Sequence, residues 1–368
     1  MKDKKRLLLV VPDSTRKAHL DKILPHLLRI LTGSCKVDIV AATGLHKPHS
    51  GKELEELVGH SVFARVNRVY SHNYAKSNLA SFGVTKSGIP ICLNKNLKRY
   101  DGIISIGVIE PHLYAGYSGG AKTIAIGLAG EDIINRTHHP SFLDRQGVSI
   151  GSIRRNAFQR TLWEIVKPIP YIFSINVIND SSGRAVKLFF GKPKEVFEKG
   201  AAFARRIYEK EVKGRADVVI ANVACPKDIN LYQASRAINY IADSRPSILK
   251  DGGFLVVSAR LRDGLGSGLA EKRCFEALRR KKCLKEFVED IKSKGCRGGE
   301  HRAYMIARAM LRVRVIIAGQ GAPEITRGLP FIAFRGVEEA MRYIRRESPN
   351  KPKIYVVPDA FSIIAKAA

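Results

Sequence analysis

The sequence predicts an α/β fold with two domains, each a mainly parallel β-sheet flanked by helices. Three observations support this prediction. The chain has 368 residues, more than one typical core contains. Short apolar runs alternate with longer segments of helical periodicity along its whole length. A new apolar run begins directly after the Lys-Gly-Arg sequence at residues 213–215. We therefore expect domains at residues 1–213 and 214–368.

The apolar runs of the first domain predict four strands, at residues 6–11, 37–41, 102–106 and 171–177. Residues 18–31 carry leucines and isoleucine at helical spacing. A second helix is expected over residues 50–57, with Ser50 as its N-cap and Glu53 completing a capping box. A long surface helix is expected over residues 192–212. In the second domain the predicted strands are 216–220, 254–258, 314–318, 330–334 and 354–357.

The composition is that of a globular protein, with 45% hydrophobic and 26% charged residues. No run reaches the roughly 18 apolar residues that a membrane span requires. The six cysteines are scattered without a CxxC pair, which favours a reducing, cytoplasmic location. The basic first residues precede only a short apolar run with no cleavage site, so we expect a strand there and not a signal peptide.

The chain is strongly basic, with 63 Lys and Arg against 34 Asp and Glu and a net charge of +29. This balance raises the possibility of nucleic-acid binding, because counterion release favours phosphate contacts. The charges are spread along the chain, however, and no aromatic motif accompanies them. We favour a solvated basic surface and keep a basic nucleic-acid-binding protein as an alternative.

Two polar segments directly follow predicted strands, where ligands bind in open α/β sheets. Asp13-Ser14-Thr15-Arg16 follows the first strand, and Arg16 can hold a carboxylate through two parallel hydrogen bonds. The simpler interpretation of this segment is a helix cap. His46 lies in the segment after the second strand and could act as a general base, although an isolated loop histidine is more often a surface residue.

The segment at residues 107–123 contains Glu110-Pro111-His112, clustered glycines, Ser118 and Lys122. Residues 116–120 match G-x-S-x-G, so a serine hydrolase using Ser118 is an alternative function. That motif requires the strand to run directly into the serine, which Glu110-Pro111-His112 prevents here. The segment also approaches a P-loop, but Ala121 replaces the second glycine. His138 and His139 follow at a predicted helix end.

A fourth polar segment, at residues 222–236, follows the first strand of the second domain. It contains Tyr232, Gln233 and Arg236. Tyr232 and Arg236 are four residues apart and would share one face of a helix. On its own such a pair is usually surface packing.

Taken together, these segments resemble the lactate racemase family. The resemblance comprises D-x-T-R after the first strand, A-T-G-x-H after the second, E-P-H-x-x-A-G-x-S-G-G-x-K with a histidine 16 residues later, and L-Y-Q-A in the second domain. Order and spacing hold over roughly the first 240 residues. The position of Arg236 is commonly Lys in this family, which leaves the choice of substrate open.

The resemblance implies a nickel-pincer cofactor, a nickel complex of pyridinium-3,5-bisthiocarboxylic acid mononucleotide, made by separate cofactor-synthesis enzymes. Lys122 would be its covalent attachment point, His138 the nickel ligand, and residues Asp13, Ser14, Thr15 and Arg16 part of its binding site. His139 is the alternative ligand, but the spacing from Lys122 favours His138.

The implied activity is inversion of the C2 centre of a 2-hydroxy acid by reversible hydride transfer. His46 and His112 would be the two acid/base residues. Arg16, Tyr232, Gln233 and Arg236 would bind the substrate. The resemblance also implies an active site in the cleft between the two domains.

Overall fold

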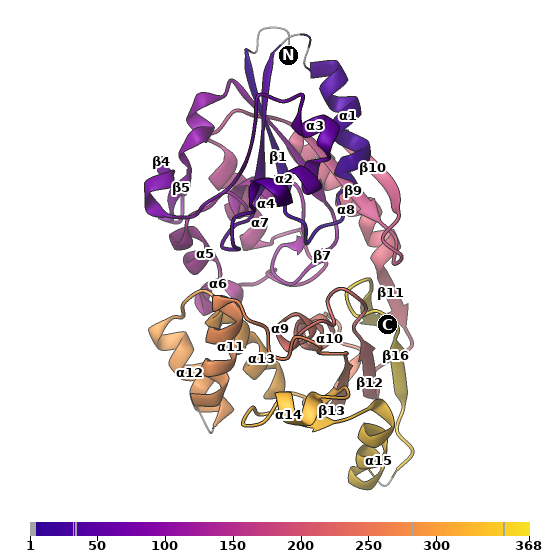
Figure 1. The fold of residues 1–368 in the computed structure, drawn as a ribbon. Coiled ribbons are helices and arrows are strands. Elements are labelled where there is room, and N and C mark those ends of the chain that lie inside the picture. The colour runs from indigo at the N-terminus through magenta and orange to yellow at the C-terminus, as the bar shows by residue number, and fades with distance from the viewer. Residues whose placement is uncertain (1–4, 32, 34, 281–282, 349) are drawn as a thin grey trace. The chain divides into compact units, whose positions relative to one another are not determined.

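The computed structural model describes residues 5–31, 33, 35–280, 283–348 and 350–368. The chain divides into two compact units, called unit 1 and unit 2 here (Figure 1). Unit 1 comprises Met1–Glu110, Tyr117–Thr137 and Ile153–Ile207. Unit 2 comprises Pro111–Gly116, His138–Ser152 and Tyr208–Ala368. The expected boundary between residues 213 and 214 stays a prediction.

Unit 1 is built on a six-stranded sheet with the order β10-β9-β6-β1-β2-β3, in which only the β9–β10 pair is antiparallel. Four of these strands were predicted from apolar runs, and all four are confirmed. β3 and β10 were not predicted, because both lack a buried apolar run. The strands are β1 (Arg6–Pro12), β2 (Lys36–Ala42), β3 (Arg68–Ser71), β6 (Gly102–Val108), β9 (Tyr171–Asn179) and β10 (Ala185–Gly191).

Short helices and a small hairpin complete unit 1 (Figure 1). The expected capping box of α2 is present, since the Ser50 side chain accepts from the backbone N–H of Glu53 and Glu53 returns the bond. The helices are α1 (Leu20–Leu31), α2 (Gly51–Val58), α3 (His60–Phe63), α4 (Lys122–Ala125), α5 (Glu131–Thr137), α7 (Ala157–Val166) and α8 (Pro193–Tyr208), with 3-10 turns η1 (Lys76–Asn78) and η2 (Lys95–Arg99), and the further strands β4 (Leu79–Val84) and β5 (Pro90–Asn94). The last residue of α8 and the first residue of strand β8 (Gly116–Tyr117) belong to unit 2.

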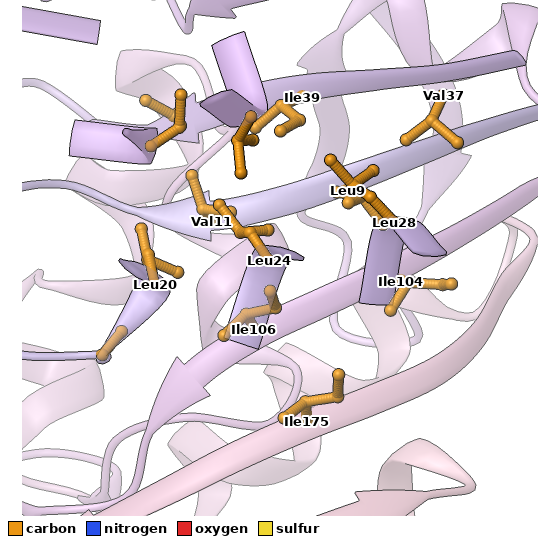
Figure 2. Close-up of a cluster of buried hydrophobic side chains, with 14 of the residues drawn as sticks. Leu9, Val11, Leu20, Leu24, Leu28, Val37, Ile39, Ile104, Ile106 and Ile175 are labelled. Atoms are coloured by element: carbon orange, nitrogen blue, oxygen red, sulfur yellow. The ribbon is translucent and has the colours of Figure 1, made fainter. Parts of the chain in front are cut away.

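The core of unit 1 lies between the parallel sheet and helix α1. Figure 2 shows Leu24 and Leu28 of α1 beside Val11 and Leu9 of β1, and all four side chains are fully buried. Leu20, Leu24 and Leu28 are spaced four residues apart and therefore lie on one face of α1, as the sequence predicted. This packing fixes the position of β1, whose carboxyl end carries the first polar segment.

Unit 2 contains a five-stranded, wholly parallel sheet with the order β15-β14-β13-β12-β16. All five strands were predicted, and together with unit 1 they confirm the α/β fold class. The strands are β12 (Ala216–Asn222), β13 (Leu249–Ser258), β14 (Arg314–Ala318), β15 (Ile332–Phe334) and β16 (Ile354–Val357), with β7 (Pro111–His112), β11 (Glu209–Val212) and β17 (Ile364–Ala367) outside this sheet.

The helices of unit 2 include a packed group in which α13 contacts α10, α11 and α12. The sheet has its own core, formed by residues such as Phe254, Val256 and Ile344. The helices are α6 (Pro140–Leu143), α9 (Leu231–Ala234), α10 (Arg236–Ala242), α11 (Leu269–Arg280), α12 (Leu284–Lys294), α13 (Glu300–Met310), α14 (Ala322–Ile325) and α15 (Val337–Glu347). No helix within the described ranges is long and apolar enough to span a membrane.

The predicted helix over residues 192–212 is wrong at its C-terminal end. Helix α8 ends at Tyr208, and residues 209–212 form β11, which pairs in parallel with β17. Lys366 forms an ion pair with Glu209, with 2.8 Å between Nζ and Oε2. The strand depends on a partner about 150 residues further along the chain, so local periodicity could not reveal it.

We expect Leu24→Ala to lower the free energy of unfolding by about 2–5 kcal/mol, because it removes a fully buried side chain from this core. Ile30→Ala is the matched control on the same helix, since Ile30 is 68% exposed, and it should change stability by less than about 0.5 kcal/mol. Urea unfolding of the three proteins measures both. Equal effects would contradict the packing described here.

Candidate active site

The carboxyl ends of three neighbouring strands of unit 1 carry the predicted polar residues. β1 lies between β2 and β6, and both pairs are parallel. Asp13 therefore follows β1 at the same edge of the sheet where His46 follows β2 and Glu110 follows β6. The prediction that ligand-binding residues follow these strands rests on this geometry.

Asp13 and His46 form a directly hydrogen-bonded pair. His46 Nδ1 lies 2.8 Å from Asp13 Oδ2 and donates to it. The Asp13 side chain is 9% exposed, whereas that of His46 is 66% exposed. Because the carboxylate engages Nδ1–H, the lone pair of the neutral imidazole lies on Nε2. His46 is thus prepared to accept a proton at Nε2.

The turn after β2 brings His46 to this position. Gly44 has φ of 58°, in the left-handed region that favours glycine, and its N–H donates to the carbonyl of Gly127. The His46 N–H then donates to the carbonyl of Thr43, whose hydroxyl donates to the carbonyl of His72. A backbone turn anchored at three points therefore supports the imidazole.

The carboxyl group of Asp13 stays ionised in its buried position. Burial alone would raise its pKa, but the hydrogen bonds from His46 and Thr15 and the charge of Arg16 hold the pKa at about 2. Asp13 Oδ1 accepts from both the backbone N–H and the hydroxyl of Thr15, which closes the turn. Ser14 and Thr15 are exposed.

Arg16 is held by a carboxylate from the neighbouring segment. Its Nη1 forms an ion pair with Glu110 Oε1, and both side chains are about one quarter exposed. The Arg16 N–H donates to the carbonyl of Asp13. Sequence analysis noted Glu110 only as part of a motif and did not predict this pairing.

Lys122 is the first residue of α4 and follows the glycine-rich loop. It is half-buried. Gly119 has φ of 82°, and a Cβ atom there would lie 2.6 Å from Asn176 Oδ1, which itself accepts from the N–H of Gly120. The glycines thus allow close packing of the loop against β9. Ser118 is buried, and its hydroxyl donates to the carbonyl of Val108, so this hydroxyl supports the loop.

The second predicted histidine, His112, has the opposite hydrogen-bonding arrangement. Its Nδ1 accepts from the backbone N–H groups of Tyr114 and Ala115, each at 3.2 Å. In the neutral imidazole the hydrogen must then lie on Nε2. His112 is thus prepared to donate a hydrogen bond from its Nε2, whereas His46 is prepared to accept one at its own Nε2.

Tyr114 lies among three histidines of unit 2. Its ring centroid is 5.6 Å from that of His112, 5.3 Å from that of His138 and 6.3 Å from that of His301. The rings of His138 and His301 are 4.9 Å apart. Burial, and then the nearby His138 and Arg302, hold the pKa of His301 well below its ordinary value.

His139 has a local structural role. It is the N-cap of α6, where its Nδ1 accepts from the backbone N–H of Ser141. His138 makes edge-on ring contacts with Tyr114 and His301 instead. The two adjacent histidines therefore differ in surroundings.

The segment with Tyr232, Gln233 and Arg236 forms two short helices, α9 and α10, that meet at Ser235. Gln233 Oε1 accepts from Arg236 Nη1 at 3.1 Å, and the Arg236 guanidinium lies over the ring of Phe361. Burial raises the pKa of Tyr232, while Arg302 and Arg236 oppose the rise. Its phenol is therefore a hydrogen-bond donor at neutral pH.

Sequence analysis did not select His301, Arg302 or Tyr114. Glu300-His301-Arg302 begins helix α13, and polar residues in a first helical turn are normally solvated. The structure instead buries Glu300 and Arg302. One pattern in the sequence could have indicated this burial. Residues 303–307, which follow these polar residues directly, form a nearly uninterrupted apolar stretch.

A separate cavity of about 580 Å³ lies at the carboxyl ends of β12, β13, β14 and β15 in unit 2. Arg260, Arg262 and Arg335 line it, and Arg260 is paired with Asp228. None of the predicted site residues lines this cavity. Across the described residues, no group of three or more His, Cys, Asp or Glu side chains is placed to hold a metal ion.

Comparison with known proteins connects this fold and these residues to one class of enzyme. A family model described as the lactate racemase N-terminal domain matches residues 1–150, and one described as the lactate racemase C-terminal domain matches residues 212–365. A lactate racemase of Thermoanaerobacterium thermosaccharolyticum is 26% identical over 370 residues, covering 99% of this chain and 85% of the relative. A lactate racemase of Lactiplantibacillus plantarum is 24% identical over 367 residues, with the same coverage.

Solved structures agree with these matches. The lactate racemase apoprotein from T. thermosaccharolyticum has a TM-score of 0.91 at 26% identity, covering 99% of this chain and 87% of that one. A Thermotoga maritima protein with a TM-score of 0.77 and 18% identity shares the fold.

The two-unit α/β fold and the family matches define an isomerase of the racemase class. The chain belongs to the lactate racemase family. The family expected from the sequence is thereby confirmed.

The low pKa of Asp13 predicts a specific acid sensitivity. A carboxyl group whose folded pKa is about 2, against an ordinary 3.8, stabilises the fold above pH 4 and loses that contribution as the pH falls toward 2. The contribution is about 2 kcal/mol. We expect Asp13→Asn to remove this part of the pH dependence, measured by urea unfolding between pH 6 and pH 2. If the free energy of unfolding of the variant depends on pH in the same way as that of the wild type, Asp13 is not the responsible group.

Proposed function

We propose that this protein is a 2-hydroxyacid racemase or epimerase that inverts the C2 centre of its substrate with the help of a nickel-pincer nucleotide. The observation that carries the proposal is the opposite preparation of two imidazoles. His46 has its Nδ1–H on Asp13, and His112 has its Nδ1 on two backbone N–H groups. Inversion through a planar 2-keto acid needs one group that takes the hydroxyl proton and another that returns one.

The donor groups of the chain fit the proposed cofactor. Lys122 supplies a primary amine for a thioamide link, and its half-buried position at the start of α4 follows a closely packed loop. His138 supplies an imidazole, which is a suitable nickel ligand. His139 is the weaker candidate, because its Nδ1 caps α6. When bound, the nucleotide would take the C2 hydrogen with its bonding electrons and return it to either face of the planar carbon.

His46 would remove the proton from the 2-hydroxyl group at Nε2. Asp13 orients the ring through Nδ1 and stabilises the imidazolium that forms, because the buried carboxylate remains charged. His112 would hydrogen-bond the substrate oxygen through Nε2–H. When the opposite hand is formed, it would return a proton to that oxygen as an imidazolium, in which Nδ1 also carries a hydrogen. Each positioned acid or base of this kind typically accelerates a reaction about a hundred- to ten-thousand-fold.

The remaining predicted residues would bind and orient the substrate. Arg16, fixed by Glu110, would contribute positive charge beside Asp13, and residues 13–16 would line the cofactor site. Tyr232 would donate a hydrogen bond, while Gln233 fixes the guanidinium of Arg236. Arg236 would bind the substrate carboxylate with its planar fork. Enzymes that synthesise the cofactor would be the necessary partners, in the cytoplasm.

Lys122→Ala should prevent cofactor attachment, because alanine has no amine. We expect wild-type protein, co-produced with cofactor-making enzymes, to gain the mass of one mononucleotide and about one nickel per chain. The variant should gain neither. Intact-mass spectrometry and metal analysis provide the measurement. Lys199→Ala is the matched control, because Lys199 is exposed on α8, and it should load like the wild type. Loading of the Lys122 variant would contradict the assignment.

The fate of the C2 hydrogen distinguishes the proposed reaction from proton abstraction. If the hydrogen leaves and returns with its electrons, a 2-deuterated hydroxy acid should keep its label through racemisation in ordinary water. NMR and chiral chromatography follow label and configuration together. Loss of the label at the rate of racemisation would refute the proposed chemistry, even with an active racemase.

A further inference from the structure

Arg302 is a buried cation without a counter-charge. It lies on α13, and its side chain is among the most enclosed polar groups of unit 2, with the residue only 4% exposed. Its Nη1 donates to Asn239 Oδ1 at 3.2 Å. Its Nε and Nη2 have no partner in hydrogen-bond geometry, and the phenol of Tyr114 is a polar neighbour of the guanidinium. Within the described part of the chain, no carboxylate lies at ion-pair distance from it.

The same helix shows how a paired arginine differs. Arg308, two turns further along α13, forms ion pairs with both Asp144 and Asp243. The titratable groups that act on Arg302 are instead the phenols of Tyr114 and Tyr232 and the thiol of Cys274, and none of them is a carboxylate. A guanidinium buried among groups without negative charge is costly, and an anion bound there would offset this cost.

Arg302 is adjacent to proposed substrate-binding residues. Tyr232 lies within the electrostatic reach of both Arg302 and Arg236. Arg302 Nη1 also binds Asn239, which lies three residues after Arg236 on α10. Arg236 also has no carboxylate partner in the described structure, since Nη1 binds the neutral amide of Gln233 and the guanidinium covers Phe361. Two guanidinium groups without carboxylate partners thus act on one phenol. A substrate with a single carboxylate would satisfy only one of them.

We propose that Arg302 binds a second carboxylate of the substrate, so that the enzyme acts on 2-hydroxy dicarboxylic acids, with Arg236 holding the carboxylate next to C2. This inference rests on the function proposed above. Bidentate hydrogen bonding from Nε and Nη2, the two nitrogens without partners, matches the geometry of a carboxylate. The same two nitrogens could also bind a phosphate group, such as that of the nucleotide. The experiment below distinguishes a carboxylate from a phosphate at this position.

The test compares two nearly isosteric substrates, 2-hydroxysuccinate (malate) and 2-hydroxybutanoate, which differ by a carboxylate in place of a methyl group. For the cofactor-loaded wild type we expect kcat/KM to be about a hundredfold higher with 2-hydroxysuccinate. Arg302→Met should lower that value about a hundredfold and change the 2-hydroxybutanoate value less than about threefold. The kcat/KM of Arg302→Lys with 2-hydroxysuccinate should lie between those of the wild type and Arg302→Met. Lysine keeps the positive charge but lacks the planar pair of donors of the guanidinium. Arg346→Met, an exposed position on α15, is the matched charge control and should change neither.

Equal kcat/KM for the two substrates in the wild type, or an equal loss with both in Arg302→Met, would overturn the proposal. Thermal unfolding of the full chain without cofactor gives a second, independent readout. A rise in Tm with 2-hydroxysuccinate that is absent in Arg302→Met supports the site even if no 2-hydroxy acid is racemised, in which case only the proposed function fails. A rise with inorganic phosphate and none with 2-hydroxysuccinate would assign the site to a phosphate and overturn the proposal.

Discussion

The parallel pairing of β1 with both β2 and β6 is the constraint on which the rest of unit 1 depends. It brings the ends of three strands, far apart in sequence, to one edge of the sheet. Asp13 then contacts His46, and Arg16 contacts Glu110. Neither pair could form if β1 were displaced by one residue, because successive side chains point to opposite faces of a strand. The apolar contact with α1 that holds β1 is therefore also what positions the imidazole.

Much of this arrangement could be predicted from local patterns. Buried parallel strands are nearly continuous apolar runs, and the polar residues that follow them mark the functional edge of the sheet. Asp13, Arg16 and His46 were selected in this way, and the structure places them at this edge. The β11–β17 pair could not be, since each strand has four residues and little apolar signal, and it exists only through its distant partner. The same limit applies to Glu110, whose role depends on a contact 94 residues away.

Unit 2 illustrates a different limit. Its sheet was predicted strand for strand, yet its polar cluster lies among helices, where sequence patterns carry less information. A first helical turn rich in charge normally indicates solvent exposure, but α13 packs against α10, α11 and α12 and buries its first turn. The side chains of Glu300 and Arg302 are thus identified as buried only by tertiary packing. Periodicity describes one helix at a time, whereas burial is a property of the group.

The hydrogen bonds of the His46 and His112 imidazoles also bear on how these residues could return to their starting protonation states. If His46 and His112 are the acid and base proposed above, they must exchange roles, because a racemase works from either hand of its substrate. At His46 the exchange is easy, because the Asp13 carboxylate accepts from Nδ1 in both protonation states. At His112, Nδ1 would have to gain a hydrogen and release the N–H groups of Tyr114 and Ala115, which would require the backbone turn to change. The proposed mechanism therefore requires two protonation forms of the unliganded protein, one for each enantiomer. The interconversion of these two forms would be a step of the catalytic cycle in which no substrate takes part.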